Sequence, residues 1–351
     1  MRETRRDTAF RTIPVEEAVG ATLAHDVTEV ISGEFKGPAF KKGHRISSGD
    51  LCRLMRMGKN NLYVLDLAAD EVHEDDAVLE LASALSGPGV TFSASPAEGK
   101  LELRADYPGL FKVNIQALEE FNMLRDVMCA SIHTHAAVKA NQSLAATRAI
   151  PLVIHRTDLD TAVNFARENY PIFSVKIFQS LKIRLIITGN EVYKGLIQDR
   201  FKAIVEQKTT ELGAVLEEAV ILPDDRDMIS RQIRNYLEKD TDLIITTGGM
   251  SVDPDDVTKA GIEDSGFEQI HYSAAVLPGA MFLLGYHKNT AVMGLPACGL
   301  YHRTTIFDLI LPRIMAGEKP GPRDLARLSH GGLCLNCKPC RFPACSFGKS
   351  G

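Results

Sequence analysis

The chain has 351 residues, of which 45% are hydrophobic and 24% charged, and this length suits two folded domains because single hydrophobic cores rarely exceed about 250 to 300 residues. Its formal net charge of −5 at pH 7 disfavours nucleic acid as the main partner, since binding to a phosphate backbone depends on clustered lysine and arginine. No apolar run approaches the ~18 residues of a transmembrane helix and the first residues lack the apolar core of a signal peptide, so a cytoplasmic protein without membrane contact is expected.

The first half of the chain shows no regular alternation of strands and helices. Residues 1–180 combine short extended stretches, such as GEFKGPAFKKGHRIS, with helical spacing of apolar residues between Ile115 and Met128. The segment around His133 and His135 also favours a helix, on which two side chains two positions apart diverge rather than share a metal ion. We therefore expect a mixed α+β domain in this half.

From residue 181 onward, strands and helices alternate. Short apolar runs rich in β-branched residues predict buried strands, over residues 182–188, 214–222 and 242–247, and a strand pair around 285–297. Helices are predicted between and after these strands, up to about residue 212, over 226–239, from 254 and over 300–315. The alternation predicts an α/β domain over residues 181–318, with a doubly wound, mostly parallel sheet and ligands at the carboxyl ends of its strands.

Two glycines follow the third predicted strand and lead into an acidic segment, SVDPDDVT. Gly248 and Gly249 allow the backbone to approach a ligand, and a loop that enters a helix offers free N–H groups to an anion. The loop lacks the lysine of a P-loop and the third glycine of a dinucleotide fingerprint, which disfavours ATP hydrolysis and NAD binding. Two interpretations of Asp253, Asp255 and Asp256 stay open: they stabilise the start of the next helix, or they face a divalent cation or donor groups of the ligand.

Four motifs occur in the order found in one protein family. The run TDLIITTGGMSVDPDDVT (241–258) resembles the signature of the molybdopterin-binding, MoaB/Mog-type domain of molybdenum-cofactor biosynthesis proteins. The other matching motifs are ITGNEVYKG (187–195), PDDRDMI (223–229), and PGAMFLLG with VMGLPAC (278–285 and 292–298). The last two resemble the molybdopterin molybdotransferase, gephyrin-like branch, and the resemblance covers about residues 181–316.

The resemblance implies a role for each matching position. It places Thr247, Gly248, Gly249 and Ser251 at the phosphate and adjoining groups of molybdopterin, and Asp224 and Asp256 at a reaction site that works with Mg²⁺. The remaining pterin-binding positions of the matching motifs are Thr188, Gly189, Glu191, Pro278, Gly279, Gly294 and Pro296. The family further implies molybdopterin as ligand or substrate, molybdate as a second substrate, self-association, and partners among molybdoenzymes or cofactor-biosynthesis proteins.

Three positions depart from the family pattern. Asn190 stands where the family usually has an aspartate, Ala280 replaces a lysine, and Cys298 occupies an asparagine position. The chain thus lacks a cation that would lie against molybdate. Two functions stay open: a molybdotransferase-like enzyme that completes or modifies molybdopterin, and a molybdopterin-binding protein without turnover that acts as a sensor, carrier or insertion partner.

Four of the seven cysteines lie close together in the segment 331–351, which a linker over 319–330 connects to the α/β domain. Cys334, Cys337, Cys340 and Cys345 have the spacing C-x2-C-x2-C-x4-C, which in a reducing compartment indicates metal binding rather than disulfides. Zn²⁺ needs four ligands at about 2.3 Å from one ion, usually from two separated knuckles. C-x2-C-x2-C is a common start of an iron–sulfur motif, so the spacing favours an iron–sulfur cluster and leaves zinc open.

Overall fold

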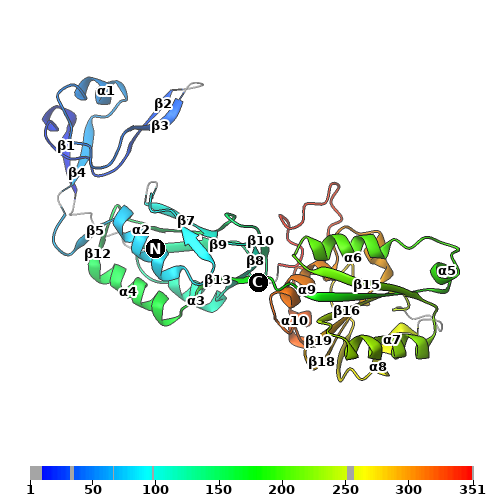
Figure 1. The fold of residues 1–351 in the computed structure, drawn as a ribbon. Helices are drawn as coiled ribbons and strands as arrows, with labels where there is room; N and C mark the ends of the chain where they lie inside the picture. The colour runs from blue at the N-terminus through cyan, green and yellow to red at the C-terminus, as the bar shows by residue number, and fades with distance from the viewer. Residues whose placement is uncertain (1–9, 32–34, 66, 97–98, 251–256, 350–351) are drawn as a thin grey trace. The chain divides into compact units, whose positions relative to one another are not determined.

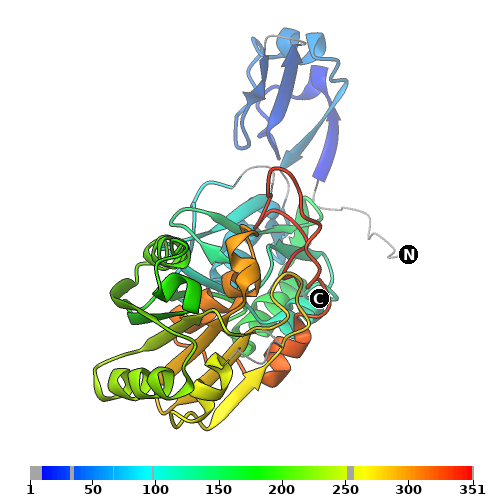
Figure 2. The ribbon, with the colours of Figure 1, turned by 90° about the vertical axis from the view of Figure 1, so that its right-hand side faces the viewer.

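The computed structural model describes residues 10–31, 35–65, 67–96, 99–250 and 257–349. The chain forms two compact units, the first mainly from residues up to 175 and the second mainly from residue 176 onward. Figures 1 and 2 show the ribbon from two directions. None of the helices in the described ranges combines the length and the apolar character needed to cross a lipid bilayer.

The first unit consists of antiparallel strands and short helices, in agreement with the predicted mixed α+β half. Its strands are β1 (Phe10–Pro14), β2 (Val27–Ile31), β3 (Phe35–Phe40), β4 (Asn61–Leu65), β5 (Glu71–His73), β6 (Val90–Phe92), β7 (Lys100–Ala105), β9 (Val127–Ser131), β11 (Ser143–Ala149) and β12 (Val153–His155). Its helices are η1 (Val15–Glu17), α1 (Leu51–Arg56), α2 (Glu74–Leu85), α3 (Ile115–Phe121) and α4 (Arg156–Glu168). The strands β8 (Gly109–Val113) and β13 (Phe173–Ile177) lie where the chain passes between the units.

Of two helical predictions in this half, the one between Ile115 and Met128 is confirmed only over its first part, and the one around His133 and His135 is wrong. Helix α3 ends at Phe121, and the following residues up to Met128 lead into strand β9. The segment around His133 and His135 contains a turn in which His135 has a φ of +65°. It joins β9 to the short strand β10 (Ala137–Val138), which leads to β11. Strand β11 pairs with β7 on one side and β9 on the other, so ladder hydrogen bonds and packing override the helix preference of its alanines.

Glu74, at the start of α2, is an acid buried inside the first unit. Its side chain is 6% exposed, and its carboxylate lies 3.6 Å from the guanidinium of Arg148. Burial, assisted by the neighbouring charge of Asp75, raises the pKa of Glu74 from 4.5 to about 7. The folded protein therefore holds this proton to a higher pH than the unfolded chain does, and it loses stability as the pH rises from 4.5 through 7.

We expect the substitution Glu74→Gln to raise the free energy of unfolding at pH 8, by up to about 3 kcal/mol, because the amide avoids burying a charge. At pH 4 the effect should be small, because the acid is then protonated in both states. Urea denaturation at the two pH values measures the difference. The exposed Glu119, on α3, supplies the control substitution Glu119→Gln, and an equal response of both variants to pH would contradict the interpretation.

The second unit contains one six-stranded sheet flanked by helices. Its strands are β14 (Lys182–Thr188), β15 (Val215–Leu222), β16 (Leu243–Thr247), β17 (Gln269–Tyr272), β18 (Leu283–His287) and β19 (Thr290–Leu295). Its helices are α5 (Asn190–Tyr193), α6 (Phe201–Thr210), α7 (Arg226–Glu238), α8 (Thr258–Glu263), η2 (Ala297–Leu300), α9 (Ile306–Met315) and α10 (Pro322–Arg327). The strand order is β15-β14-β16-β19-β18-β17, with the first four strands parallel, which confirms the predicted doubly wound, mostly parallel sheet.

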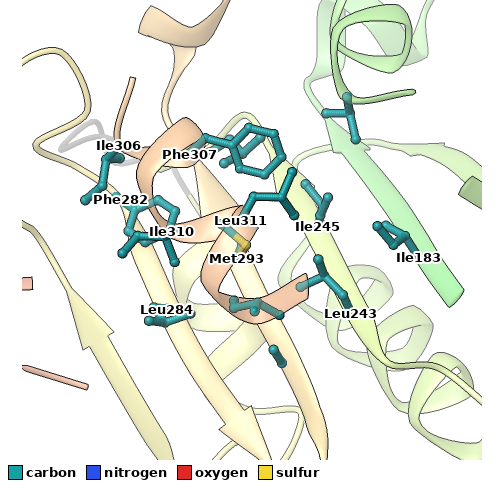
Figure 3. Close-up of a cluster of buried hydrophobic side chains, with 14 of the residues drawn as sticks. Ile183, Leu243, Ile245, Phe282, Leu284, Met293, Ile306, Phe307, Ile310 and Leu311 are labelled. Carbon is teal, nitrogen blue, oxygen red and sulfur yellow. The ribbon is translucent and has the colours of Figure 1, made fainter. Parts of the chain in front are cut away.

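Alternating side chains of the central strands build two cores, one on each face of the sheet. Ile183 and Leu185 of β14 pack with residues of α6 and α9, whereas Ile186 packs with residues of α7 and α8. Figure 1 shows these helix pairs on opposite sides of the sheet, and Figure 3 shows the first core, where Ile310 and Leu311 of α9 lie over the strands. A strand covered on both faces needs apolar residues at nearly every position, which explains the uninterrupted apolar runs in the sequence.

The observed elements differ from the predicted ones mainly at the last two helices. Helix α9 begins at Ile306 rather than residue 300, because Thr305 caps it with its side chain and Asp308 completes a capping box. The segment 319–330, predicted as a linker, contains α10, whose Leu325 is buried in the same core as α9.

Candidate functional site

The carboxyl ends of the four parallel strands meet at one edge of the sheet, here called the carboxyl edge. Thr188 at the end of β14 pairs with Leu222 of β15, and Thr247 at the end of β16 pairs with Leu295 of β19. The chain places β15 on one side of β14 and then β16 on the other, so the strand order reverses between β14 and β16. Open α/β sheets bind ligands at such a reversal, which makes the carboxyl edge the candidate site.

The loops that follow β14 and β16 are interlocked at this reversal. The hydroxyl of Thr188 donates to the carbonyl oxygen of Thr247 at 3.1 Å and lies 2.8 Å from the hydroxyl of Thr258. Gly248 has a φ of +86°, and a Cβ there would collide with the carbonyl oxygen of Thr188. Gly249 has a φ of +53°, and a Cβ there would collide with the Thr258 side chain. Both glycines are therefore required for backbone conformation and for close packing of the two loops.

Thr247 and Gly189 are the two predicted positions with groups or space left for a ligand. The hydroxyl of Thr247 is fully buried and has no hydrogen-bond partner among the described residues. Leaving such a hydroxyl unpaired costs about 1 to 3 kcal/mol, which is a reason to expect a binding role. Gly189 has a φ of +143°, and a Cβ there would approach no atom outside its neighbours closer than 3.8 Å.

The two acids before α7 have different roles. Asp224 is half-buried at the carboxyl edge, and its Oδ2 accepts the backbone N–H of Asn190 at 2.8 Å. This hydrogen bond ties the loop after β15 to the loop after β14. Asp225 caps α7 by accepting the N–H of Met228 at 2.9 Å. Glu191, the remaining predicted acid of this region, is exposed on α5.

The predicted positions near β18 and β19 lie at the same edge but contact other parts of the protein. A Cβ at Gly279 would lie 2.6 Å from Ile306 of α9, and one at Gly294 would lie 2.5 Å from the Met250 side chain. Pro278 precedes Gly279, and Pro296 follows β19 directly. The two glycines therefore make room for side chains of the domain itself.

Two of the predicted site residues, Ser251 and Asp256, lie outside the described residues. Across the ranges that the structure describes, no three His, Cys, Asp or Glu side chains are arranged to hold a metal ion. Cys298, in η2, is half-buried, and burial raises the pKa of its thiol above the ordinary value, which disfavours the thiolate form.

Two contributors to the site were not predicted from the sequence. Thr258 joins the two interlocked loops, although its position at the end of an acidic run before a helix was visible in the sequence. Tyr272, at the end of β17, donates its hydroxyl to the carbonyl oxygen of Met250 at 2.6 Å and so holds the residue that follows the two glycines. Nothing local in the sequence indicates this long-range contact.

Comparison with known families identifies the second unit. The family described as "Probable molybdopterin binding domain" matches residues 184–316. Residues 184–316 are a molybdopterin-binding domain. The family resemblance inferred from the four motifs is thereby confirmed, and the domain belongs to the group that serves molybdenum-cofactor biosynthesis. Residues 12–66 match a second family, described as a domain of unknown function.

The molybdopterin-binding domain is similar to parts of longer proteins and to nearly the whole of one solved structure. A "Molybdopterin molybdenumtransferase" of Haemophilus influenzae is 29% identical over 158 residues, which are 42% of this chain and 38% of that protein. A "CinA-like protein" of Thermosipho melanesiensis is 36% identical over 78 residues, 22% of this chain and 19% of that protein. The solved structure of the molybdopterin biosynthesis Mog protein from Mycobacterium ulcerans covers 38% of this chain and 91% of its own, at 20% identity and a TM-score of 0.32. The matches therefore span well under half of the length of these sequence relatives.

Proposed function

We propose that the protein binds molybdopterin at the carboxyl edge and inserts molybdenum into it, with Mg²⁺ as the assisting cation. The observation that carries this proposal is the meeting of Thr188, Thr247, the two loop glycines and Asp224 at the strand reversal of a molybdopterin-binding domain. The similarity to a molybdopterin molybdenumtransferase supports the reaction class. Molybdate is the proposed second substrate.

The proposed roles follow from the chemistry of each group. Backbone N–H groups beyond β16, with the hydroxyls of Thr247 and Ser251, bind the terminal phosphate of the pterin. Asp224 and Asp256 would hold Mg²⁺, which would supply positive charge against the anionic oxygens of molybdate and the ligand. Thr188, Gly189, Glu191, Pro278, Gly279, Gly294 and Pro296 shape the pterin site around them.

A second candidate function is favoured by Ala280. This residue stands where the related transferases carry a lysine, and its backbone carbonyl accepts the N–H of Ala274 at 2.9 Å, so the position offers no cation to molybdate. In this alternative the protein is a sensor, carrier or insertion partner that binds molybdopterin without turnover.

The deciding experiment is incubation of the full-length protein with molybdopterin, molybdate and Mg²⁺, with and without ATP. Binding is measured from the fluorescence of the pterin, and product formation from the activity of an apo-molybdoenzyme added afterwards. Saturable binding with product supports the transferase, and saturable binding without product supports the carrier. Absence of binding would reject both functions.

The setting and partners of this activity form part of the proposal. We propose the cytoplasm as its setting, a reducing compartment in which the seven cysteines would stay thiols. The proposed partners are a second copy of the chain, and an apo-molybdoenzyme or another cofactor-biosynthesis protein that receives the product. Size-exclusion chromatography of the protein, alone and mixed with an apo-molybdoenzyme, tests both associations. A metal centre at the four C-terminal cysteines is proposed independently of the pterin site.

A further inference from the structure

The four C-terminal cysteines line one pocket, here called the cysteine pocket. Cys334, Cys337, Cys340 and Cys345 share its walls with Thr304 and Phe342, among other residues. The pocket is a surface depression of about 330 Å³, a volume that includes space open to solvent. The four cysteines, which lie within twelve consecutive residues, therefore contribute to the lining of the same pocket.

The backbone around the pocket is fastened to the molybdopterin-binding domain. Leu277 donates its N–H to the carbonyl oxygen of Gly332 at 2.8 Å, and its own carbonyl accepts the N–H of Cys334 at 2.8 Å. At the other end, Phe347 is 3% exposed within the core that contains α9. Both ends of the cysteine segment are therefore held, which positions the thiols without a metal having to order the whole tail.

Two of the sulfur atoms accept backbone hydrogen bonds of the same kind. The N–H of Asn336 donates to Cys334 Sγ at 3.4 Å, and the N–H of Phe342 donates to Cys340 Sγ. In each case the donor lies two residues after the cysteine. The hydroxyl of Thr304 lies 3.6 Å from Cys340 Sγ. Such donors stabilise metal-bound thiolates and orient them toward the metal.

The charge of the segment also suits a thiolate centre. Residues 331–349 contain Lys338, Arg341 and Lys349 but no aspartate or glutamate. Outside this segment, Arg303 and Asp308 both lie near Cys340, with opposite charges. Four thiolates around a metal centre leave a net negative charge, which nearby cations stabilise. Phe342 and Phe347 form an edge-to-face ring pair in the lining of the pocket.

The spacing of the four cysteines along the chain favours a cluster over a single ion. One tetrahedral Zn²⁺ would draw its sulfurs to about 2.3 Å from the metal, and so to about 3.8 Å from each other. Zinc usually takes its thiolates from two separated knuckles, whereas C-x2-C-x2-C within one short run is a common start of an iron–sulfur motif. In a cubane cluster each thiolate binds a different iron, so the ligands stand further apart around a larger object.

We propose that Cys334, Cys337, Cys340 and Cys345 hold a [4Fe–4S] cluster in the cysteine pocket. Leu277 precedes β18 and Thr304 follows β19, so the cluster would be fastened to two segments at the carboxyl edge. This cluster site does not depend on molybdopterin binding, so its test is independent of the test of the proposed function.

The test is metal and sulfide analysis of the full-length protein purified without oxygen. We expect about four iron atoms and four acid-labile sulfides per chain, with broad visible absorption that dithionite bleaches. One zinc per chain with no iron would overturn the proposal, and so would four freely titrating thiols with no bound metal. These measurements on the unaltered protein decide the question whether or not the variants fold.

Variants then locate the cluster. We expect Cys337→Ser to lower iron content at least about twofold, because one cluster ligand is lost. The matched control is Cys52→Ser, which removes an exposed thiol of the first unit and should leave iron unchanged. Equal iron in the two variants would overturn the assignment of these ligands. Asp224→Asn should keep its iron even if it loses pterin chemistry, so failure of the cluster and failure of the proposed function are distinguishable.

Discussion

Replacement of Asp224 by asparagine is expected to slow molybdenum insertion at least about 100-fold, while affinity for molybdopterin stays within about threefold. The amide oxygen can still accept the N–H of Asn190, so the link between the loops after β14 and β15 is kept. Only the negative charge that would hold Mg²⁺ is lost. Product formation and pterin fluorescence titration, measured on the same preparation, separate the two effects.

The neighbouring acid supplies a matched control for this prediction. Asp225→Asn also removes one charge, and asparagine caps a helix as well as aspartate does, so α7 should be unaffected. We expect this variant to retain both binding and turnover. If Asp224→Asn were as active as Asp225→Asn, the carboxylate of Asp224 would have a structural role only. If both variants lost activity equally, general negative charge at this edge would be the cause.

Replacement of Gly248 by alanine is expected to destabilise the second unit by about 3 to 5 kcal/mol. The alanine would have to keep the left-handed backbone conformation of Gly248, which costs about 1 to 2 kcal/mol. Its Cβ would also collide with the carbonyl oxygen of Thr188. Because that carbonyl belongs to the end of β14, the loop can yield only by disturbing the sheet. Denaturant unfolding, followed by circular dichroism, measures the loss.

A substitution at Gly213 separates the cost of the left-handed conformation from the cost of the collision. Gly213 has nearly the same backbone angle as Gly248, with φ of +85° against +86°, but a Cβ there would meet nothing within 4 Å. Gly213→Ala should therefore show the conformational cost alone, about 1 to 2 kcal/mol. A similar loss for both variants would show that the close approach of the two loops contributes little.

The sheet of the second unit was predictable because its signals are local. Runs such as KIRLIIT and DLIITT are rich in apolar and β-branched residues without a period-2 alternation, as expected of a strand covered on both faces. The ends of these strands carry the family motifs, so the positions of Thr188, Thr247 and Asp224 at one edge followed from the strand order expected for such a fold.

The parts that could not be predicted depend on contacts between distant residues. Strand β11 is rich in alanine and looks helical in isolation, but two neighbouring strands provide hydrogen bonds on both of its sides. The sequence does not show which of Asp224 and Asp225 caps α7 and which accepts the N–H of Asn190, because either of two adjacent acids could cap the helix. The docking of Cys334 on Leu277 joins residues 57 positions apart that share no pattern.

The interlocked loops also bear on the thermodynamics of binding. Thr188, Gly248 and Thr258 hold each other through buried hydrogen bonds and tight backbone packing before any ligand arrives. A ligand that enters there does not have to freeze these residues, so little of its interaction energy is lost to conformational entropy. The preformed loops therefore favour rigid, planar ring systems over flexible chains as ligands. When both protein and ligand are rigid before binding, the least conformational entropy is lost on association.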